Sequence, residues 1–280
     1  MAIAELKEAL LLLRHTPSIW VPGIVGGLLA AALWVSLSLS GTFFAGRLLV
    51  ISALVFHLFT TGILVVIRNR EGDIRTLLTG GIGYYFRVLL PQLVIIFCIM
   101  LIFTLIMITF GLVAGTADPG IVTALTIGFM IPAGILTIFY DTAAVFEERK
   151  VFDSIWRSSQ VVMTHINEVI SFLFVSAGIV IGVIFMLMIV WEVALYDKLE
   201  PITRYNETQL QAFTPDQFMS MKSPDGIWIT AIVLFTGVVL LVPLLYTYKA
   251  CFYRKLSTSA FITQQPTTGE FDSKGRWYKY

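Results

Sequence analysis

Six long apolar stretches decide what this chain can fold into. They lie at residues 19–40, 43–67, 88–114, 121–146, 167–192 and 227–249. Each is close to or above the roughly 20 residues that a helix needs to cross the hydrocarbon core of a bilayer. Because lipid cannot hydrogen-bond free backbone groups, apolar segments of this length cross as helices. The sequence therefore predicts an all-α integral membrane protein with about six transmembrane helices in three hairpins.

The composition points to the same environment. Hydrophobic residues make up 57% of the 280 residues and charged residues only 13%, against roughly 25% charged residues in soluble domains. The lipid bilayer is therefore the expected partner of most of the surface. The net charge of +1 indicates no nucleic-acid partner. Cys98 and Cys251 lie far apart in the predicted topology, so we expect neither a disulfide nor a metal site between them.

Basic residues are concentrated on one side of the predicted spans. One side carries only four of the 19 Lys and Arg residues, namely Arg47, Lys198, Arg204 and Lys222. The other fifteen fall on the side that also holds both chain ends. Cytoplasmic loops are enriched in Lys and Arg. We therefore expect a plasma-membrane protein with its N- and C-termini in the cytoplasm.

Three amphipathic stretches precede the three hairpins. Apolar residues recur at helical spacing within residues 3–13, 74–89 and 152–166. In the third stretch, Phe152, Ile155 and Trp156 share an apolar stripe that faces the membrane or the bundle, and Arg157 lies outside the stripe. Such helices lie flat at the interface with basic residues toward lipid headgroups. The pattern predicts three repeats of an interfacial helix followed by a hairpin.

Two segments carry a resemblance to a known group of families. The segments "AELKEALLLLRHTPSIWVPGI" and "AVFEERKVFDSIWRSSQVVMTHINEVI" resemble the opening and middle of poorly characterised archaeal and bacterial membrane families. The group includes the membrane domain fused to some glycerophosphodiester phosphodiesterases. Here Ser154 stands where those families usually have Ala, and Ser159 where they usually have Trp. The resemblance implies a prokaryotic membrane architecture. It implies no catalysis, because we find no soluble phosphodiesterase domain in the sequence.

Two ionisable residues inside the spans form a candidate polar site. His57 lies within the second predicted span, and Asp141 lies a turn or more inside the end of the fourth. Ionisable residues within a membrane often mark ion or substrate pathways. A structural role is an equal alternative: His57 could hydrogen-bond a neighbouring helix, and Asp141 could pair with an arginine or cap the following turn.

No catalytic or cofactor motif accompanies these residues. The chain has no G-x-S-x-G or H-E-x-x-H sequence. The three histidines, His15, His57 and His165, belong to different predicted elements and lack metal-ligand spacing. The "TGGIG" sequence at 79–83 follows no strand, so we expect it to bend a helix or admit a close neighbour. We therefore predict no enzyme activity, no cofactor and no metal.

Two segments lie outside the predicted spans: an outer loop within the predicted membrane domain of residues 1–256, and the tail that follows this domain. The outer loop, about residues 193–226, contains a capping-box sequence near 214–217 and the triplet Asn206-Glu207-Thr208, a candidate glycosylation site. The C-terminal tail, residues 257–280, is polar without apolar periodicity, which is typical of disorder. Either segment could contact a protein partner.

The leading functional prediction is a non-enzymatic structural, scaffolding or accessory protein of the plasma membrane that acts through a partner. The alternative is a small transporter or channel with a polar site near His57. A membrane enzyme would need at least two polar groups that converge in one cavity.

Overall fold

The computed structural model confirms the all-α membrane fold. It describes residues 2–114, 119–197, 200, 224–263, 269–271 and 277–279. Six helical segments are long and apolar enough to cross a membrane: Pro17–Ser40, Thr42–Asn69, Ile74–Thr109, Thr123–Phe146, Ile166–Ala194 and Pro224–Ser257. The chain is therefore a multi-pass membrane protein.

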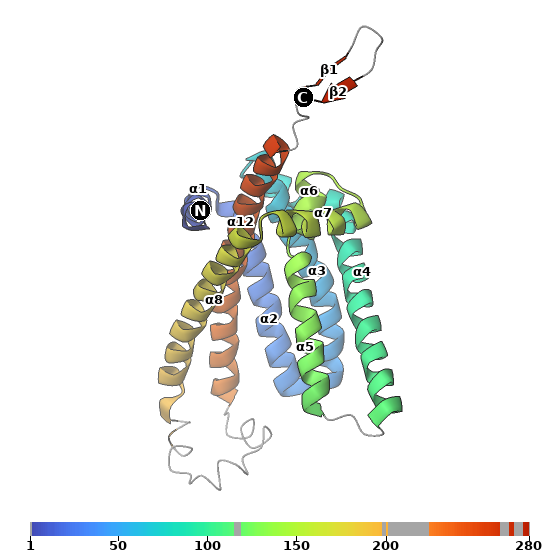
Figure 1. Cartoon of the computed structure of the whole chain (residues 1–280). Helices are drawn as coiled ribbons and strands as arrows, with labels where there is room; N and C mark the ends of the chain where they lie inside the picture. The colour runs from blue at the N-terminus through green and yellow to red at the C-terminus, as the bar shows by residue number, and fades with distance from the viewer. Residues whose placement is uncertain are drawn as a thin grey trace.

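From α1 to α8 the elements follow one another with short connections, and residues 195–223 separate α8 from α12 (Figure 1). They are α1 (Ala2–His15), η1 (Pro17–Trp20), α2 (Val21–Ser40), α3 (Thr42–Asn69), α4 (Ile74–Ala114), α5 (Pro119–Leu136), α6 (Tyr140–Phe146), α7 (Val151–Thr164), α8 (Ile166–Ala194), α12 (Pro224–Thr263), β1 (Gly269–Phe271) and β2 (Trp277–Lys279).

One end of the bundle is built differently from the other. Here α1 and α7 lie across the ends of the long helices, next to α6 and the last turns of α12 (Figure 1). We call this the capped end. The helix α12 packs along α2 most extensively and also contacts α1, α3 and α8. The helix α12 therefore connects most of the other elements of the capped end to one another.

The amphipathic stretches are helical, with one difference from the expected repeat. The first and third form the separate helices α1 and α7. The second is the first part of α4, which runs without a break for 41 residues. The structure breaks a different element: the fourth span consists of α5 and α6, separated by residues 137–139.

The apolar stripe of α7 points away from the protein. Phe152 and Trp156 are 72% and 73% exposed, and Ile155 is half-buried. Arg157, which we placed outside the stripe and expected near lipid headgroups, is instead buried at 6% exposure. The reason is that its guanidinium reaches a carboxylate inside the bundle, as described below. The stripe therefore faces the bilayer, and the polar side of α7 faces the protein.

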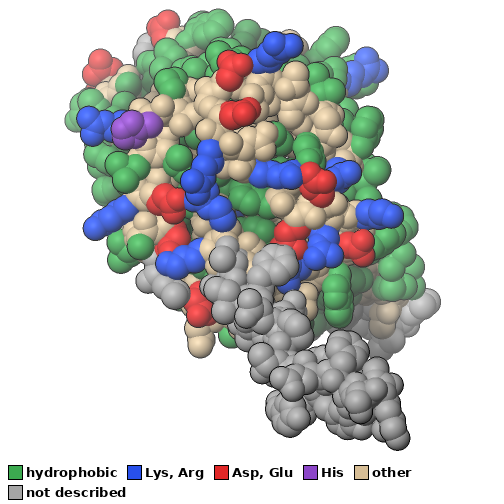
Figure 2. All heavy atoms as spheres, turned by 90° about the horizontal axis from the view of Figure 1, so that it is seen from above, with side chains coloured by type: hydrophobic (Ala, Val, Ile, Leu, Met, Phe, Trp, Pro, Cys, Tyr) green, Lys and Arg blue, Asp and Glu red, His purple; other side chains and the backbone are tan. Residues whose placement is uncertain are grey.

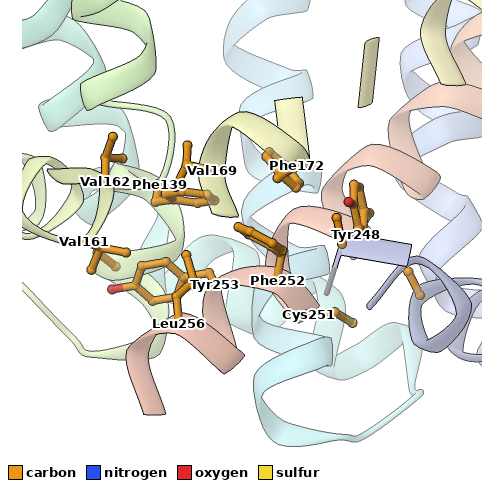
Figure 3. Packing of buried hydrophobic residues seen from close by; sticks show 13 residues of the cluster. Phe139, Val161, Val162, Val169, Phe172, Tyr248, Cys251, Phe252, Tyr253 and Leu256 are labelled. Atoms are coloured by element: carbon orange, nitrogen blue, oxygen red, sulfur yellow. The ribbon is translucent and has the colours of Figure 1, made fainter. Parts of the chain in front are cut away.

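An aromatic cluster fills the interior of the capped end (Figure 3). Phe172 of α8 stacks on Phe252 of α12 with ring centroids 4.7 Å apart, and it lies 4.8 Å from the ring of Tyr248. Phe139, at the break in the fourth span, lies within 6.1 Å of Phe172, Phe252 and Tyr253. Aromatic pairs at these separations stabilise beyond the area they bury. The cluster joins the start of α8 to α12 and to the broken span.

Glycines set the closest helix contacts. A Cβ at Gly62 of α3 would lie 2.5 Å from the Leu77 carbonyl oxygen, and one at Gly81 of α4 would lie 2.6 Å from the Leu58 carbonyl oxygen. The "TGGIG" sequence thus allows close packing of α4 on α3, as predicted. Gly178 and Gly182 of α8 differ from these glycines. A Cβ at either would meet no atom of the described chain within 4 Å.

The outer loop and the C-terminal tail are only partly described. The boundary expected at residue 256 falls inside α12, which continues to Thr263. Within the tail for which we expect disorder, β1 and β2 pair antiparallel. The candidate glycosylation site Asn206 and most of the outer loop lie outside the described residues.

Gly81→Ala should destabilise the protein, although alanine usually stabilises a helix interior by about 0.5–1 kcal/mol relative to glycine. The added Cβ would press on the backbone of α3, and overpacking of this kind typically costs about 1–3 kcal/mol. Gly83→Ala is the matched control, because its Cβ would meet nothing within 4 Å. Thermal unfolding in detergent should show a lower melting temperature for Gly81→Ala only. Equal melting temperatures would contradict the close α3–α4 contact.

Candidate functional site

The centre of the candidate site is an ion pair between α6 and α12. Lys249 Nζ donates a hydrogen bond to Asp141 Oδ2, and the two side chains are 15% and 6% exposed. The other carboxylate oxygen, Oδ1, accepts from the Thr142 amide at 2.7 Å and the Thr142 hydroxyl at 3.1 Å. The Lys249 ammonium also lies 4.5 Å from the centre of the Tyr246 ring. Both charges are therefore satisfied within the protein.

His57 lies beside this pair. The imidazole is within electrostatic range of both Asp141 and Lys249, and its ring meets Tyr85 of α4 edge to face at 6.2 Å. Its Nε2 atom is buried and has no hydrogen-bond partner among the described residues. The structure thus brings together the two residues predicted as an intramembrane polar site. Among the described residues the ion-pair partner of Asp141 is Lys249, where an arginine was one of the expected partners.

The break in the fourth span directly precedes Asp141. At residues 137–139 the backbone leaves the α-helical pattern, and Ser158 of α7 satisfies two of the groups that become free. Its hydroxyl accepts a hydrogen bond from the Phe139 amide at 3.0 Å and donates one to the Leu136 carbonyl at 2.8 Å. Ser158 is fully buried. One hydroxyl therefore holds the ends of α5 and α6 together and sets the position of Asp141.

Glu147, immediately after α6, joins α7 to α12. Its carboxylate accepts from Arg157 Nε at 3.0 Å and from the Tyr253 hydroxyl at 2.7 Å. The Glu147 and Arg157 side chains are only 10% and 8% exposed. Arg157 also contacts Gln160 on its own helix, with 3.3 Å between Nη1 and Oε1. This buried pair explains why Arg157 turns inward rather than toward lipid headgroups.

Glu148 makes the corresponding contact with α3 and α4. Its carboxylate accepts from Arg68 Nη2 at 2.6 Å and from the Tyr84 hydroxyl at 2.8 Å. The Arg68 and Tyr84 hydrogen bonds hold the pKa of the Glu148 carboxyl below its usual value. Glu148 also adopts a positive φ of 53°, a conformation that is uncommon for residues other than glycine. The turn after α6 therefore directs two adjacent carboxylates to opposite sides.

Further ion pairs connect α1 to α12. Glu5 pairs with Lys255, and Glu8 pairs with Arg254. Seen from above, acidic and basic side chains are intermixed over the capped end and hydrophobic side chains surround them (Figure 2). Charges of opposite sign are therefore matched locally at this end, rather than arranged as one basic surface.

Sequence reasoning found His57 and Asp141 but missed Lys249, Glu147 and Ser158. Lys249 stands at the end of the predicted sixth span, where a lysine is ordinarily read as a residue that reaches the interface. Only the packing of α6 against α12 shows that it turns inward. Ser158 carries no sequence signal, because it satisfies backbone groups about twenty residues away.

The arrangement brings a buried pair of opposite charges and an imidazole together within the spans. No group of three or more His, Cys, Asp or Glu residues that could hold a metal ion is present among the described residues.

Comparison with protein-family models, with curated proteins and with solved structures found no match to this chain.

Lys249→Met should strongly destabilise the protein, because it leaves the Asp141 carboxylate buried without its cation. Removal of one partner of a buried pair typically costs about 3–5 kcal/mol. The double variant Asp141→Asn/Lys249→Met should lose less stability than the two single effects added together. Thermal or denaturant unfolding of the four proteins in one detergent measures this coupling. Strictly additive losses would show that the two residues do not depend on each other.

Proposed function

We propose that this multi-pass membrane protein is a non-enzymatic accessory or scaffolding subunit that acts bound to another membrane protein. The observation that carries the proposal is the exposure of α8. None of its most apolar 18-residue window is buried by the described residues, against 56% for α3. The corresponding windows of the third and fourth spans are each only 6% buried. Three of six spans thus contribute little to the interior.

The contacts of α8 show where a partner could pack. Its buried residues, Val169 and Phe172, both lie in its first two turns. The 22 residues from there to Ala194 extend for about 33 Å at the helical rise. Gly178 and Gly182 lie on this stretch, four residues apart. That spacing lets a neighbouring helix approach closely. A transmembrane helix of a partner would therefore find an open and closely approachable surface.

The proposed setting is a prokaryotic plasma membrane with both termini in the cytoplasm. The support is the excess of Lys and Arg at the capped end, which the positive-inside tendency places on the cytoplasmic side. The outer loop and the C-terminal tail remain predicted partner contacts, and the relation to phosphodiesterase membrane domains remains a prediction.

Gentle extraction of the full chain followed by native mass spectrometry should recover a complex with a second membrane protein. Replacing both Gly178 and Gly182 with Leu should release that partner, because the larger side chains would hold a helix away. Gly46→Leu is the control: its site is equally open but lies on α3. A protein that stays monomeric after extraction by several mild detergents and by crosslinking in the membrane would overturn the proposal.

A second candidate function, a proton or small-cation pathway, is favoured by one specific arrangement. The Asp141–Lys249 pair and His57 lie inside the spans next to a discontinuous helix. Transporters often place ion-coupling groups at such breaks, and ionisable residues within spans usually have a functional role. The same groups could equally stabilise the bundle, so a flux measurement has to separate the two.

A pathway of this kind predicts that the purified protein dissipates a pH gradient in vesicles and that His57→Ala abolishes the flux. His15→Ala is the control, since His15 lies exposed on α1 and bonds only its own helix, at the Leu11 carbonyl. If the wild-type protein leaves the gradient intact across the pH range, or if both variants conduct equally, the pathway is excluded. Neither result affects the accessory-subunit proposal.

A further inference from the structure

A cavity of about 250 Å³ opens at the capped end between α1, α3 and α12. Its inner wall is apolar, with Leu12, Ile19, Val66 and Ile67. Ile19, Val66 and Ile67 are each no more than 2% exposed, so these walls belong to the packed interior. Ligand pockets for drug-sized molecules have roughly 300–1,000 Å³. The cavity is therefore suited to a smaller group, about the size of a lipid headgroup.

The rim of the cavity carries both signs of charge. Glu8 and Arg254 line one part of it, where they pair with each other. Arg70 and Glu71, in the turn after α3, line another. In the part of the chain that the structure describes, Arg70 forms no ion pair, and the Glu71 carboxylate accepts one bond, from the Thr76 hydroxyl at 3.3 Å. One cation and one anion at the rim are thus available to a ligand.

Two helix ends add negative potential to the same place. The cavity is lined by the last turn of α1, which ends at His15, and by the last turn of α3, which ends at Asn69. The carbonyl end of a helix carries partial negative charge and attracts cations. A ligand with only negative charge would therefore be repelled by Glu8, Glu71 and two helix carbonyl ends. A ligand with only positive charge would in turn be repelled by Arg70 and Arg254.

We propose that this cavity binds a small zwitterion that joins a primary ammonium to a phosphate by a short carbon chain. The ammonium would lie toward Glu71 and the helix carbonyls, and the phosphate toward Arg70. The connecting carbons would contact the apolar wall. Two sources share this chemistry: the headgroup of phosphatidylethanolamine and free phosphoethanolamine. A site at the level of the interfacial helix α1 could be reached by both.

The test is native mass spectrometry of the full chain, delipidated in detergent and then supplied with single lipids of identical acyl chains. Phosphatidylethanolamine should bind about tenfold more tightly than phosphatidylglycerol, which lacks the ammonium, because loss of one charge-assisted hydrogen bond costs about this much. Phosphatidylethanolamine should also bind more tightly than phosphatidylcholine, whose quaternary ammonium cannot donate hydrogen bonds. Equal binding of the three lipids would overturn the proposal.

Glu71→Gln should remove the preference for phosphatidylethanolamine, because Glu71 faces the ammonium, whereas Arg70→Gln should weaken the binding of all three lipids, because they share the phosphate. Asp73→Asn and Arg75→Gln are the controls, because both residues are exposed on the same turn or just after it and neither lines the cavity. Circular dichroism and gel filtration establish that all four variants fold. A preference that survives Glu71→Gln, or binding of all three lipids that is unchanged in Arg70→Gln, would place the lipid elsewhere and overturn the proposal.

Soluble phosphoethanolamine distinguishes the two sources. If the site serves a free metabolite, phosphoethanolamine should bind the lipid-free protein and displace the lipid. If it serves a headgroup, only the lipid should bind, because the acyl chains supply part of the affinity. Failure of both ligands to bind the wild-type protein in preference to phosphatidylglycerol would rule out the zwitterion site.

Discussion

The ion pairs and hydrogen bonds of the last turns of α12 hold the capped end together. Lys249 pairs with Asp141 of α6, Tyr253 donates to Glu147, and Arg254 and Lys255 pair with Glu8 and Glu5 of α1. Apolar helices gain little from leaving lipid for one another. Polar pairs and close backbone contacts must therefore fix which helices become neighbours, and among the described residues α12 supplies the cations that pair with α1 and α6. The arrangement of α1, α6 and α7 follows from them.

The bundle divides into a closely packed capped end and a more open part because of this distribution. At the capped end, the aromatic cluster around Phe172 and Phe252 adds packing to the ion pairs (Figure 3). Away from that end, α8 has no buried residue beyond Phe172, and α5 packs mainly on α4 and α7. The proposed zwitterion cavity lies at the capped end, where its apolar wall is packed and part of its rim is formed by the Glu8–Arg254 pair. The proposed partner surface belongs to the open part, where helix faces remain available.

How much of this structure could be predicted from the sequence depends on whether a feature is determined within one segment or by contacts between segments. The six spans and the helices α1 and α7 could be predicted, because hydropathy and helical spacing belong to single segments. The side of each interfacial helix that faces the protein could not be predicted. In lipid the large apolar side chains Phe152 and Trp156 face outward and the charged Arg157 faces inward, which reverses the rule for soluble helices. Lys249 and Ser158 could not be assigned either, since their roles depend on groups brought close only by the fold.

The break in the fourth span depends both on its own segment and on contacts that only the fold creates. Its position depends on Ser158, whose hydroxyl replaces the backbone bonds that a continuous helix would make. The short helix α6 that follows carries Asp141 near its start, and Glu147 and Glu148 come directly after it. Because those three carboxylates contact α12, α7, α3 and α4, α6 is held from four directions. The helix α5 is joined to it through the break and through the two hydrogen bonds of Ser158. A displacement of α5 would therefore strain the Ser158 bonds, and a displacement of α6 would have to disturb all of the carboxylate contacts at once.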